Sequence, residues 1–342
     1  MSPLPAESQT DWLQALMPRL TLPLIAAPMF LVSGIELVVA TCVSGVVGAF
    51  PTVNCRSTDQ LHEWLCTIRA RIAAAEQATA RAAAPWCANL IVHRSNARLQ
   101  DDLSVLLRHR PELVIASVGS PAEVVAPLHD AGARVLVDVA SIRHAERAVA
   151  ASADGLVLLT AGAGGQTGWL NPLAFVRAVR RFYAGPLVLA GGIADGAALL
   201  AAQALGCELA YMGTGFIATH ESMADPAYKQ MLVDSSADDI VLTRAFTGLA
   251  TNMLRPSIAA AGLDADALPE RGVLDIAQHI SIEARERQSA RWRDIWSAGH
   301  SVGGVTAITS VAERVAQVRA EYEAARLDLR SRTRQVAGAS AA

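Results

Sequence analysis

The chain has 342 residues, and 52% of them are hydrophobic, so it can bury either one large core or two smaller ones. Its 29 Lys and Arg residues nearly balance its 32 Asp and Glu residues, and the net charge of −3 excludes the strongly basic surface typical of proteins that bind nucleic acid or anionic membranes. Its apolar runs are short and interrupted by Gly, Pro or charge, which argues against a membrane span.

Short apolar runs alternate with helix-like segments through the first 213 residues. The predicted strands are 22–26, 45–50, 86–92, 113–117, 134–139, 155–160, 186–190 and 208–213. The predicted helices between them are 34–42, 57–81, 97–109, 121–130, 142–151, 173–182 and 195–205. The strand runs are continuously apolar, as expected when both faces of a parallel sheet are buried. Eight such units over roughly 200 residues predict an α/β fold, a closed (β/α)8 TIM barrel.

An open doubly wound sheet is the alternative fold. Its dinucleotide fingerprint would need a GxGxxG loop, and the glycines at 162, 164, 165 and 168 do not have that spacing. The closed barrel therefore remains the prediction.

The pattern changes after the eighth predicted strand. Helix-like segments cover 226–233, 253–261 and 273–287, and no segment there reads as a strand. We predict a barrel over 1–223, a helical insertion over 224–296 that covers the barrel mouth, and a C-terminal segment over 297–342 that returns to the barrel with a helix at 311–330.

The cysteines and the N-terminus suggest a reducing compartment. The five cysteines are scattered without a CxxC pair, so we expect reduced thiols and no metal site. The first residues lack the basic and apolar regions of a signal peptide. We therefore expect a cytoplasmic protein.

In a barrel of this kind, function lies at the carboxyl ends of the strands. Gly191 and Gly192 follow the seventh predicted strand, and Gly213 and Thr214 follow the eighth. Backbone N–H groups in these two loops commonly bind phosphate, and without a nearby Lys or Arg the binding would depend on backbone amides and helix dipoles. The alternative is that these glycines only form tight turns.

The loop after the sixth strand, AGAGGQTGWLNP over 161–172, combines four glycines with one long polar side chain, Gln166. Small residues between a buried strand and a helix let another group approach the backbone closely. Other side chains expected at the same rim are Ala27, Pro28, Met29, Asn89, His93, Ser117 and Asp138.

Several of these motifs occur together in one family. They are Ala27-Pro28-Met29, Asn89-Leu90, AGAGGQTG, AGGIADG at 190–196, MGTGFIAT at 212–219 and WSAG at 296–299. In this order the chain resembles the nitronate monooxygenase (2-nitropropane dioxygenase) family of FMN-dependent barrels, which also resemble a flavin-dependent enoyl reductase.

The resemblance implies an FMN cofactor and a set of residues around it. The FMN phosphate would lie on Gly191, Gly192, Gly213 and Thr214. The ring would lie near Ala27, Pro28, Met29 and Asn89, with Gly164, Gly165 and Asp138 as further cofactor contacts.

Two positions depart from the family pattern. The family loop usually reads AGGH, with the His as catalytic base, whereas Gln166 stands here and can only exchange hydrogen bonds. Asp138 stands where several relatives carry Lys, so it either disfavours an anionic substrate or bonds to the flavin or its ribityl chain. His93, just past the third strand, is the candidate replacement base, and the alternative is an ordinary loop histidine.

The resemblance implies oxidation of a small nitronate by O2 to a carbonyl compound and nitrite. A nitronate is already an anion and needs no base, so Gln166 favours a nitronate, or a different substrate, over a neutral nitroalkane. One alternative is an FMN-dependent NAD(P)H reductase of a quinone or enoyl substrate. Another is a lyase-type or non-catalytic barrel that binds a phosphate ligand. We expect no nucleic-acid or membrane partner, and we leave open the use of NAD(P)H and the formation of a homodimer.

Overall fold

The computed structural model describes residues 6–246, 248–268 and 295–339. Eight parallel strands close into a barrel in the order β1-β2-β3-β4-β5-β6-β8-β9. Their bounds are β1 Leu24–Ala26, β2 Val47–Pro51, β3 Trp86–Ile91, β4 Leu113–Ser117, β5 Arg134–Val139, β6 Gly155–Leu159, β8 Leu187–Ala190 and β9 Leu209–Met212. The barrel closes where Ile25 of β1 pairs with Tyr211 of β9. The predicted (β/α)8 barrel and all eight of its strands are confirmed.

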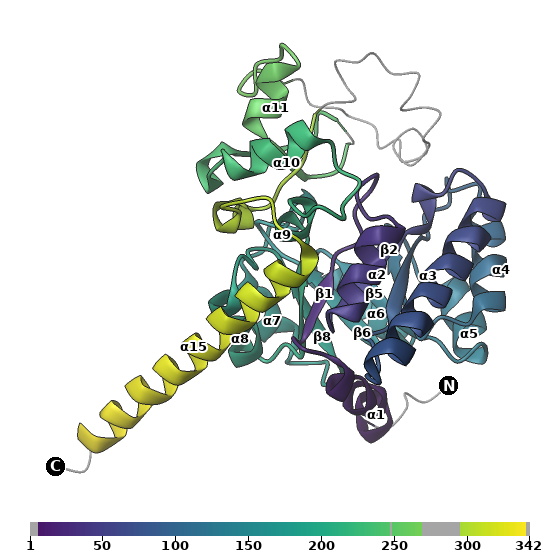
Figure 1. The fold of residues 1–342 in the computed structure, drawn as a ribbon, viewed down its shortest axis with the longest axis horizontal. Helices are drawn as coiled ribbons and strands as arrows, with labels where there is room; N and C mark the ends of the chain where they lie inside the picture. Colours follow the sequence, from purple (N-terminus) through teal and green to yellow (C-terminus); the bar gives the residue numbers. More distant parts are fainter. Residues whose placement is uncertain (1–5, 247, 269–294, 340–342) are drawn as a thin grey trace.

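Helices surround the barrel on its outside (Figure 1). They are α2 Ile35–Val43, α3 Thr58–Thr79, α4 Leu99–His109, α5 Ala122–Asp130, α6 Ile142–Ala150, α7 Pro172–Val179 and α8 Gly196–Leu205, and the one-turn α9 Thr214–Ile217 follows β9. Polar caps set several of the starts: the Ser57 side chain accepts a hydrogen bond from the Gln60 N–H, and Asp195 does the same for the Ala198 N–H.

The core has two layers. The larger one lies between the strands and the surrounding helices. The smaller one fills the barrel interior, and Leu13 and Leu16 of α1, Ala6–Leu16, pack against it. Figure 1 shows α1 at the end of the barrel opposite α10 and α11. This end of the barrel is therefore closed by side chains, and the other end is available for a site.

The insertion differs from the prediction, because it contains strands. β10, Ile240–Thr243, pairs antiparallel with β11, Thr251–Leu254. β11 also pairs antiparallel with β7, Gly165–Gln166, which lies in the glycine loop after β6. The expectation of no strand was wrong, and the predicted helix at 253–261 begins only at Arg255, as α11, Arg255–Ala260. The reason is that β11 needs partners distant in sequence, which a local pattern does not reveal.

Other parts of the insertion and its surroundings are helical. α10, Pro226–Val233, matches its predicted range. Short 3-10 helices lie in or next to the insertion, η3 Ala237–Asp239 and η4 His300–Gly304, and others lie in the barrel part of the chain, η1 Met17–Arg19 and η2 Thr52–Asn54. The helix predicted at 273–287 lies outside the described residues.

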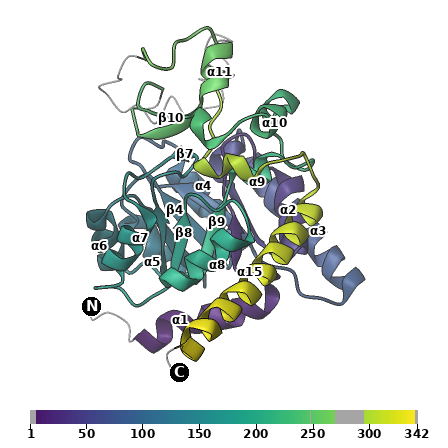
Figure 2. The ribbon, with the colours of Figure 1, turned by 90° about the vertical axis from the view of Figure 1, so that its left-hand side faces the viewer.

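The last helix, α15 at Val311–Ala339, runs nine residues beyond its predicted end. Its first half lies along α8, as both views show (Figures 1 and 2). The contact is close, because a Cβ at Gly196 of α8 would lie 2.0 Å from the backbone nitrogen of Tyr322. Within the described part of the chain, no helix combines the length and apolar character needed to cross a membrane.

Candidate active site

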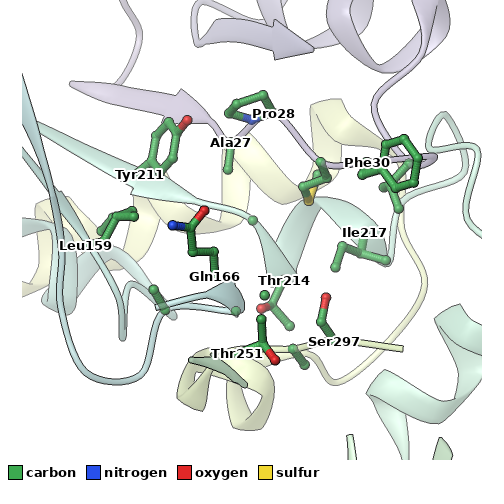
Figure 3. A pocket seen from close by; sticks show the side chains of 18 of the residues that line it. Ala27, Pro28, Phe30, Leu159, Gln166, Tyr211, Thr214, Ile217, Thr251 and Ser297 are labelled. Carbon is green, nitrogen blue, oxygen red and sulfur yellow. The ribbon is translucent and has the colours of Figure 1, made fainter. Parts of the chain in front are cut away.

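A cavity of about 410 Å³ opens at the carboxyl ends of the barrel strands. Its walls come from the carboxyl ends of all eight strands or the loops that follow them, including the glycine loop after β6, and from the insertion. Figure 3 shows side chains of these elements gathered around one space. This is the end of the barrel at which such folds carry their chemistry.

The cavity floor is a polar chain across three neighbouring strands. The Asn89 amide of β3 donates to Ser117 Oγ of β4, and Ser117 Oγ donates to Asp138 Oδ2 of β5 at 2.5 Å. The side chains of Asn89 and Ser117 are buried. We use the term cavity floor for these three residues and Tyr211 of β9, which also lines the cavity.

Two polar atoms of the cavity floor have no partner among the described residues, namely Asp138 Oδ1 and the Tyr211 hydroxyl. Removal from water raises the pKa of Asp138 to about 7, although the Ser117 hydrogen bond acts in the opposite direction. Burial, and then the nearby Asp138, raise the pKa of Tyr211 well above its usual value. The cavity floor can therefore hold a proton on Asp138 near neutral pH and offers two groups to a ligand.

A glycine-rich rim lies on the other side of the cavity. Gly191 has φ +118°, and a Cβ there would lie 2.5 Å from Thr160 Oγ1, so the position requires glycine. Gly192 has φ +76°, and a Cβ there would meet nothing within 4 Å. The Gly192 N–H donates no hydrogen bond to a described residue. Together with Gly213 and Thr214 these residues line the cavity and form an open cradle.

The glycine loop mainly accommodates other parts of the protein. A Cβ at Gly164 would lie 2.7 Å from the backbone nitrogen of Gly299, and one at Gly168 would lie 2.0 Å from the carbonyl oxygen of Leu159. The segment that approaches this loop closely is therefore 298–299, the end of the WSAG motif. Gly164 and Gly165 also line the cavity.

Gln166 is held at the cavity by the sheet of β7, β10 and β11, which we call the mouth sheet. It pairs with Thr251 of β11, and the buried Asn252 amide donates to the carbonyl oxygen of Ala163 at 2.8 Å. Gln166 is half-buried. Figure 3 shows its amide pointing into the cavity. The side chain can donate or accept a hydrogen bond there and cannot serve as a base.

The remaining predicted rim residues divide into two groups. Ala27, Pro28 and Met29, which follow β1, line the cavity, and Asn54 fixes their loop by donating to the carbonyl oxygen of Met29 at 3.0 Å. His93 does not line the cavity. Its Nδ1 contacts Ser95 Oγ at 2.7 Å within its own loop, which matches the loop-histidine alternative.

Several lining residues were not predicted from the sequence. Thr251 and Met253 come from β11, and Tyr228 of α10 stacks on Trp296 with ring centroids 5.0 Å apart. Tyr211 is part of the eighth predicted strand, but apolar periodicity alone does not distinguish an inward tyrosine from a core residue. The others follow from long-range contacts of the insertion and have no local signal.

Comparisons with known proteins agree with this geometry. The family model described as nitronate monooxygenase matches residues 14–321. A nitronate monooxygenase of Paraburkholderia phytofirmans is 30% identical, over 91% of this chain and 95% of that protein. A nitronate monooxygenase of Pseudomonas aeruginosa is 36% identical over 43% of this chain and 44% of its own length.

Two solved structures are similar along nearly their whole length. FabK from Thermotoga maritima has a TM-score of 0.76 and 25% identity, covering 95% of this chain and 98% of its own. A nitroalkane oxidase from Streptomyces ansochromogenes has a TM-score of 0.74 and 26% identity, covering 92% of this chain and 99% of its own. Members of the matched family are flavin-dependent oxidoreductases. With its family motifs arranged around one cavity at the barrel mouth, the chain belongs to the nitronate monooxygenase family.

Proposed function

We propose that this protein binds FMN in the barrel mouth and oxidises a small nitronate with O2 to a carbonyl compound and nitrite. The observation that carries this proposal is Gln166. It lines the cavity of a member of the nitronate monooxygenase family. The sequence motifs align it with the His that the family usually uses as its catalytic base. Bound FMN supplies the electron transfer and the reaction with O2.

The residues present fit FMN at both ends of the cavity. The open cradle at Gly191, Gly192, Gly213 and Thr214 suits a phosphate, because its three glycines offer backbone N–H groups and have no side chains that would fill the space. The unpartnered Asp138 Oδ1 and Tyr211 hydroxyl suit the polar edge of a ring or a polyol chain. Ala27, Pro28, Met29, Asn89, Gly164 and Gly165 are the further proposed cofactor contacts.

Gln166 binds and orients the substrate. Its amide N–H can donate to the oxygen atoms of an anionic nitronate, and such charge-assisted hydrogen bonds are stronger than neutral ones. It cannot remove the C–H proton of a neutral nitroalkane. His93 lies outside the cavity lining, so we assign it no proton transfer.

The apolar walls restrict water. Phe30, Val53, Ile91, Val118, Ile193, Ile217 and Met253 line the cavity together with the floor and the glycine rim. A dry site strengthens the hydrogen bond from Gln166 to an anion. Asp138 opposes that effect when ionised, and its raised pKa keeps it largely protonated below about pH 7.

Purified protein tests the proposal in two steps. We expect a two-band flavin absorbance spectrum, and we expect oxygen uptake with ethylnitronate or propionate-3-nitronate together with release of nitrite. A protein that shows no flavin spectrum even after FMN is added would contradict the cofactor assignment. A flavoprotein that takes up no oxygen with nitronates would contradict only the substrate assignment.

FabK favours a second candidate, because its structure is as similar to this chain as that of the nitroalkane oxidase. On this reading the same FMN site would accept electrons from NAD(P)H and reduce a quinone or enoyl substrate. NADH or NADPH oxidation that depends on a quinone or enoyl acceptor, without nitrite release from nitronates, would favour the reductase.

A further inference from the structure

Three side chains that bind metals well meet on the outer wall of the barrel, away from the cavity. His62 and Cys66 are four residues apart on α3, so they lie on the same face of that helix. His109 is the last residue of the neighbouring helix α4. Figure 1 shows α3 and α4 together at the outer side of the barrel.

The three groups are close enough to share one ion. His62 Nδ1 lies 2.8 Å from His109 Nε2, and Cys66 Sγ lies 3.7 Å from His62 Nε2. One ligand atom from each residue can be chosen so that all lie within 4.8 Å of one another. In a tetrahedral zinc site, with bonds of about 2.0–2.1 Å to nitrogen and about 2.3 Å to sulfur, ligand atoms lie roughly 3.3–3.6 Å apart. Small rotations of the side chains therefore complete the geometry.

Burial lowers the pKa of the His109 imidazole, and the nearby His62, Arg69 and Arg108 lower it further. The two arginines would also repel a cation, which a Cys66 thiolate would offset.

Accessibility matches a site that loads from solvent. His109 is 7% exposed and is held in place by packing, whereas His62 and Cys66 are exposed. Cys66 is the single exposed thiol among the five cysteines, all of which lie in the described part of the chain. A metal ion could enter from water and keep water as its fourth ligand.

A simpler explanation covers part of this arrangement. Two neutral imidazoles can share one N–H···N hydrogen bond, which accounts for the 2.8 Å contact between His62 and His109. The Cys66 thiol, one turn along the same helix face, can likewise donate to His62 Nε2 at 3.7 Å, so the metal-binding measurements below decide between a hydrogen-bonded cluster and a metal site. Nitrogen and sulfur ligands of this kind suit Zn²⁺ and similar transition-metal ions.

We propose that His62, Cys66 and His109 form a binding site for Zn²⁺ or a similar divalent transition metal, which ties α3 to α4. The site lies outside the cavity and does not depend on the proposed oxidation of nitronates. The ligands come from two helices and include only one cysteine, so no spacing pattern in the sequence reveals them.

The test uses the full-length flavoprotein without a polyhistidine tag, freed of metal by a chelator and then dialysed with Zn²⁺ or Co²⁺. We expect one equivalent of metal to be retained. The Co²⁺ difference spectrum should show a thiolate-to-metal band and the strong visible bands of tetrahedral coordination. Zn²⁺ should also raise the melting temperature, because it binds only the folded form.

Variants separate this site from adventitious binding. Cys66→Ser should remove the thiolate band, and both Cys66→Ser and His62→Ala should weaken Zn²⁺ binding by at least about tenfold. His144→Ala, which removes an exposed histidine on α6, should leave the metal content and spectrum unchanged. Melting curves in chelator should match among all variants, which shows that each one folds.

Three results would overturn the proposal. They are retention of no metal by the wild-type protein, a thiolate band that survives Cys66→Ser, and equal Zn²⁺ affinity in the His62→Ala and wild-type proteins.

Discussion

The cavity floor and the mouth sheet face the same cavity but are built in different ways. The cavity floor draws Asn89, Ser117 and Asp138 from three consecutive barrel strands, so the order of the barrel places them side by side. The mouth sheet joins Gln166 to Thr251, which lies far along the chain in the insertion.

From this difference we infer separate roles for the two regions. The cavity floor lies on the barrel strands and contains the unpartnered polar atoms, so we assign it to the cofactor. The mouth sheet is held by a few long-range hydrogen bonds and presents Gln166, so we assign it to the choice of substrate. Changes to the barrel side should therefore alter flavin binding or protonation, and changes to the mouth sheet should alter substrate use.

The largest effect should follow Asp138→Asn on the cavity floor. The folded-state pKa of about 7 lies above the ordinary value of 3.8, so the folded protein binds this proton more tightly than the unfolded chain. The stabilisation is full below about pH 4 and is lost as the pH rises through about 7, and a shift of about three units corresponds to about 4 kcal/mol.

The measurement is urea unfolding of the cofactor-free protein at about pH 4.5 and about pH 8. Relative to the wild type, Asp138→Asn should show a free energy of unfolding that falls less with rising pH. Asp238→Asn, at an exposed carboxylate, should retain the wild-type pH dependence. Equal pH dependence in Asp138→Asn and the wild type would show that Asp138 ionises normally.

The next largest effect should follow Gly192→Val at the glycine rim. The new side chain would enter the open cradle and would also strain a backbone with φ +76°. We expect flavin affinity to fall by about 100-fold, which corresponds to about 2.7 kcal/mol. Fluorescence titration with FMN measures this.

Gly132→Val is the matched control, because Gly132 has φ +89° and open space around it, but it lies in an exposed turn outside the cavity lining. It should cause similar backbone strain without loss of flavin. Equal flavin affinity in the two variants would argue against the phosphate placement.

Gln166→His, in the mouth sheet, should change which substrates the protein oxidises. A histidine at this position could accept the C–H proton of a neutral nitroalkane, and a positioned base contributes about 100-fold or more to such steps. We expect a gain of at least about tenfold in kcat/KM for nitroethane, with an unchanged flavin spectrum. Oxygen uptake measures the rate, and an unchanged rate would mean that residue 166 does not face the reacting carbon.

The smallest effect should follow Asn252→Ala, which removes the hydrogen bond from the insertion to Ala163. An unpaired buried carbonyl costs about 1–3 kcal/mol, so the glycine loop should loosen. We expect KM for the nitronate to rise by roughly threefold to tenfold, while the flavin spectrum stays the same.

Asn171→Ala provides the control for Asn252→Ala. It removes the cap of α7 and should cost about 1 kcal/mol of stability without affecting the mouth sheet. If KM rises equally in both variants, general loosening explains the effect and the contact with Ala163 does not.

The barrel could be predicted from sequence because its signals are local. Each strand is a short apolar run, and caps such as Ser57 and Asp195 mark where helices begin. Gly191 and Gly192 likewise marked the rim, because a turn that needs positive φ leaves a trace in composition.

The mouth sheet and the cluster of metal-binding side chains could not be predicted, because they depend on contacts between residues that are distant in the sequence. β7 has only two residues, Gly165 and Gln166, and exists because β11 pairs with it. His93 was predicted as a base from its position just past β3, but it does not line the cavity, and its Nδ1 contacts Ser95 Oγ within its own loop. The cluster of His62, Cys66 and His109 was missed for the same reason, because two helices must pack before it forms.

The role of Gln166 is tested by comparing kcat/KM for ethylnitronate with kcat/KM for nitroethane, from oxygen uptake and nitrite release by the wild-type flavoprotein near pH 7. With Gln166 in place of a base, we expect a preference for the nitronate of at least about 100-fold. Equal efficiency with the two substrates would contradict the proposed role of Gln166, because the protein would then contain a catalytic base and Gln166 cannot act as one.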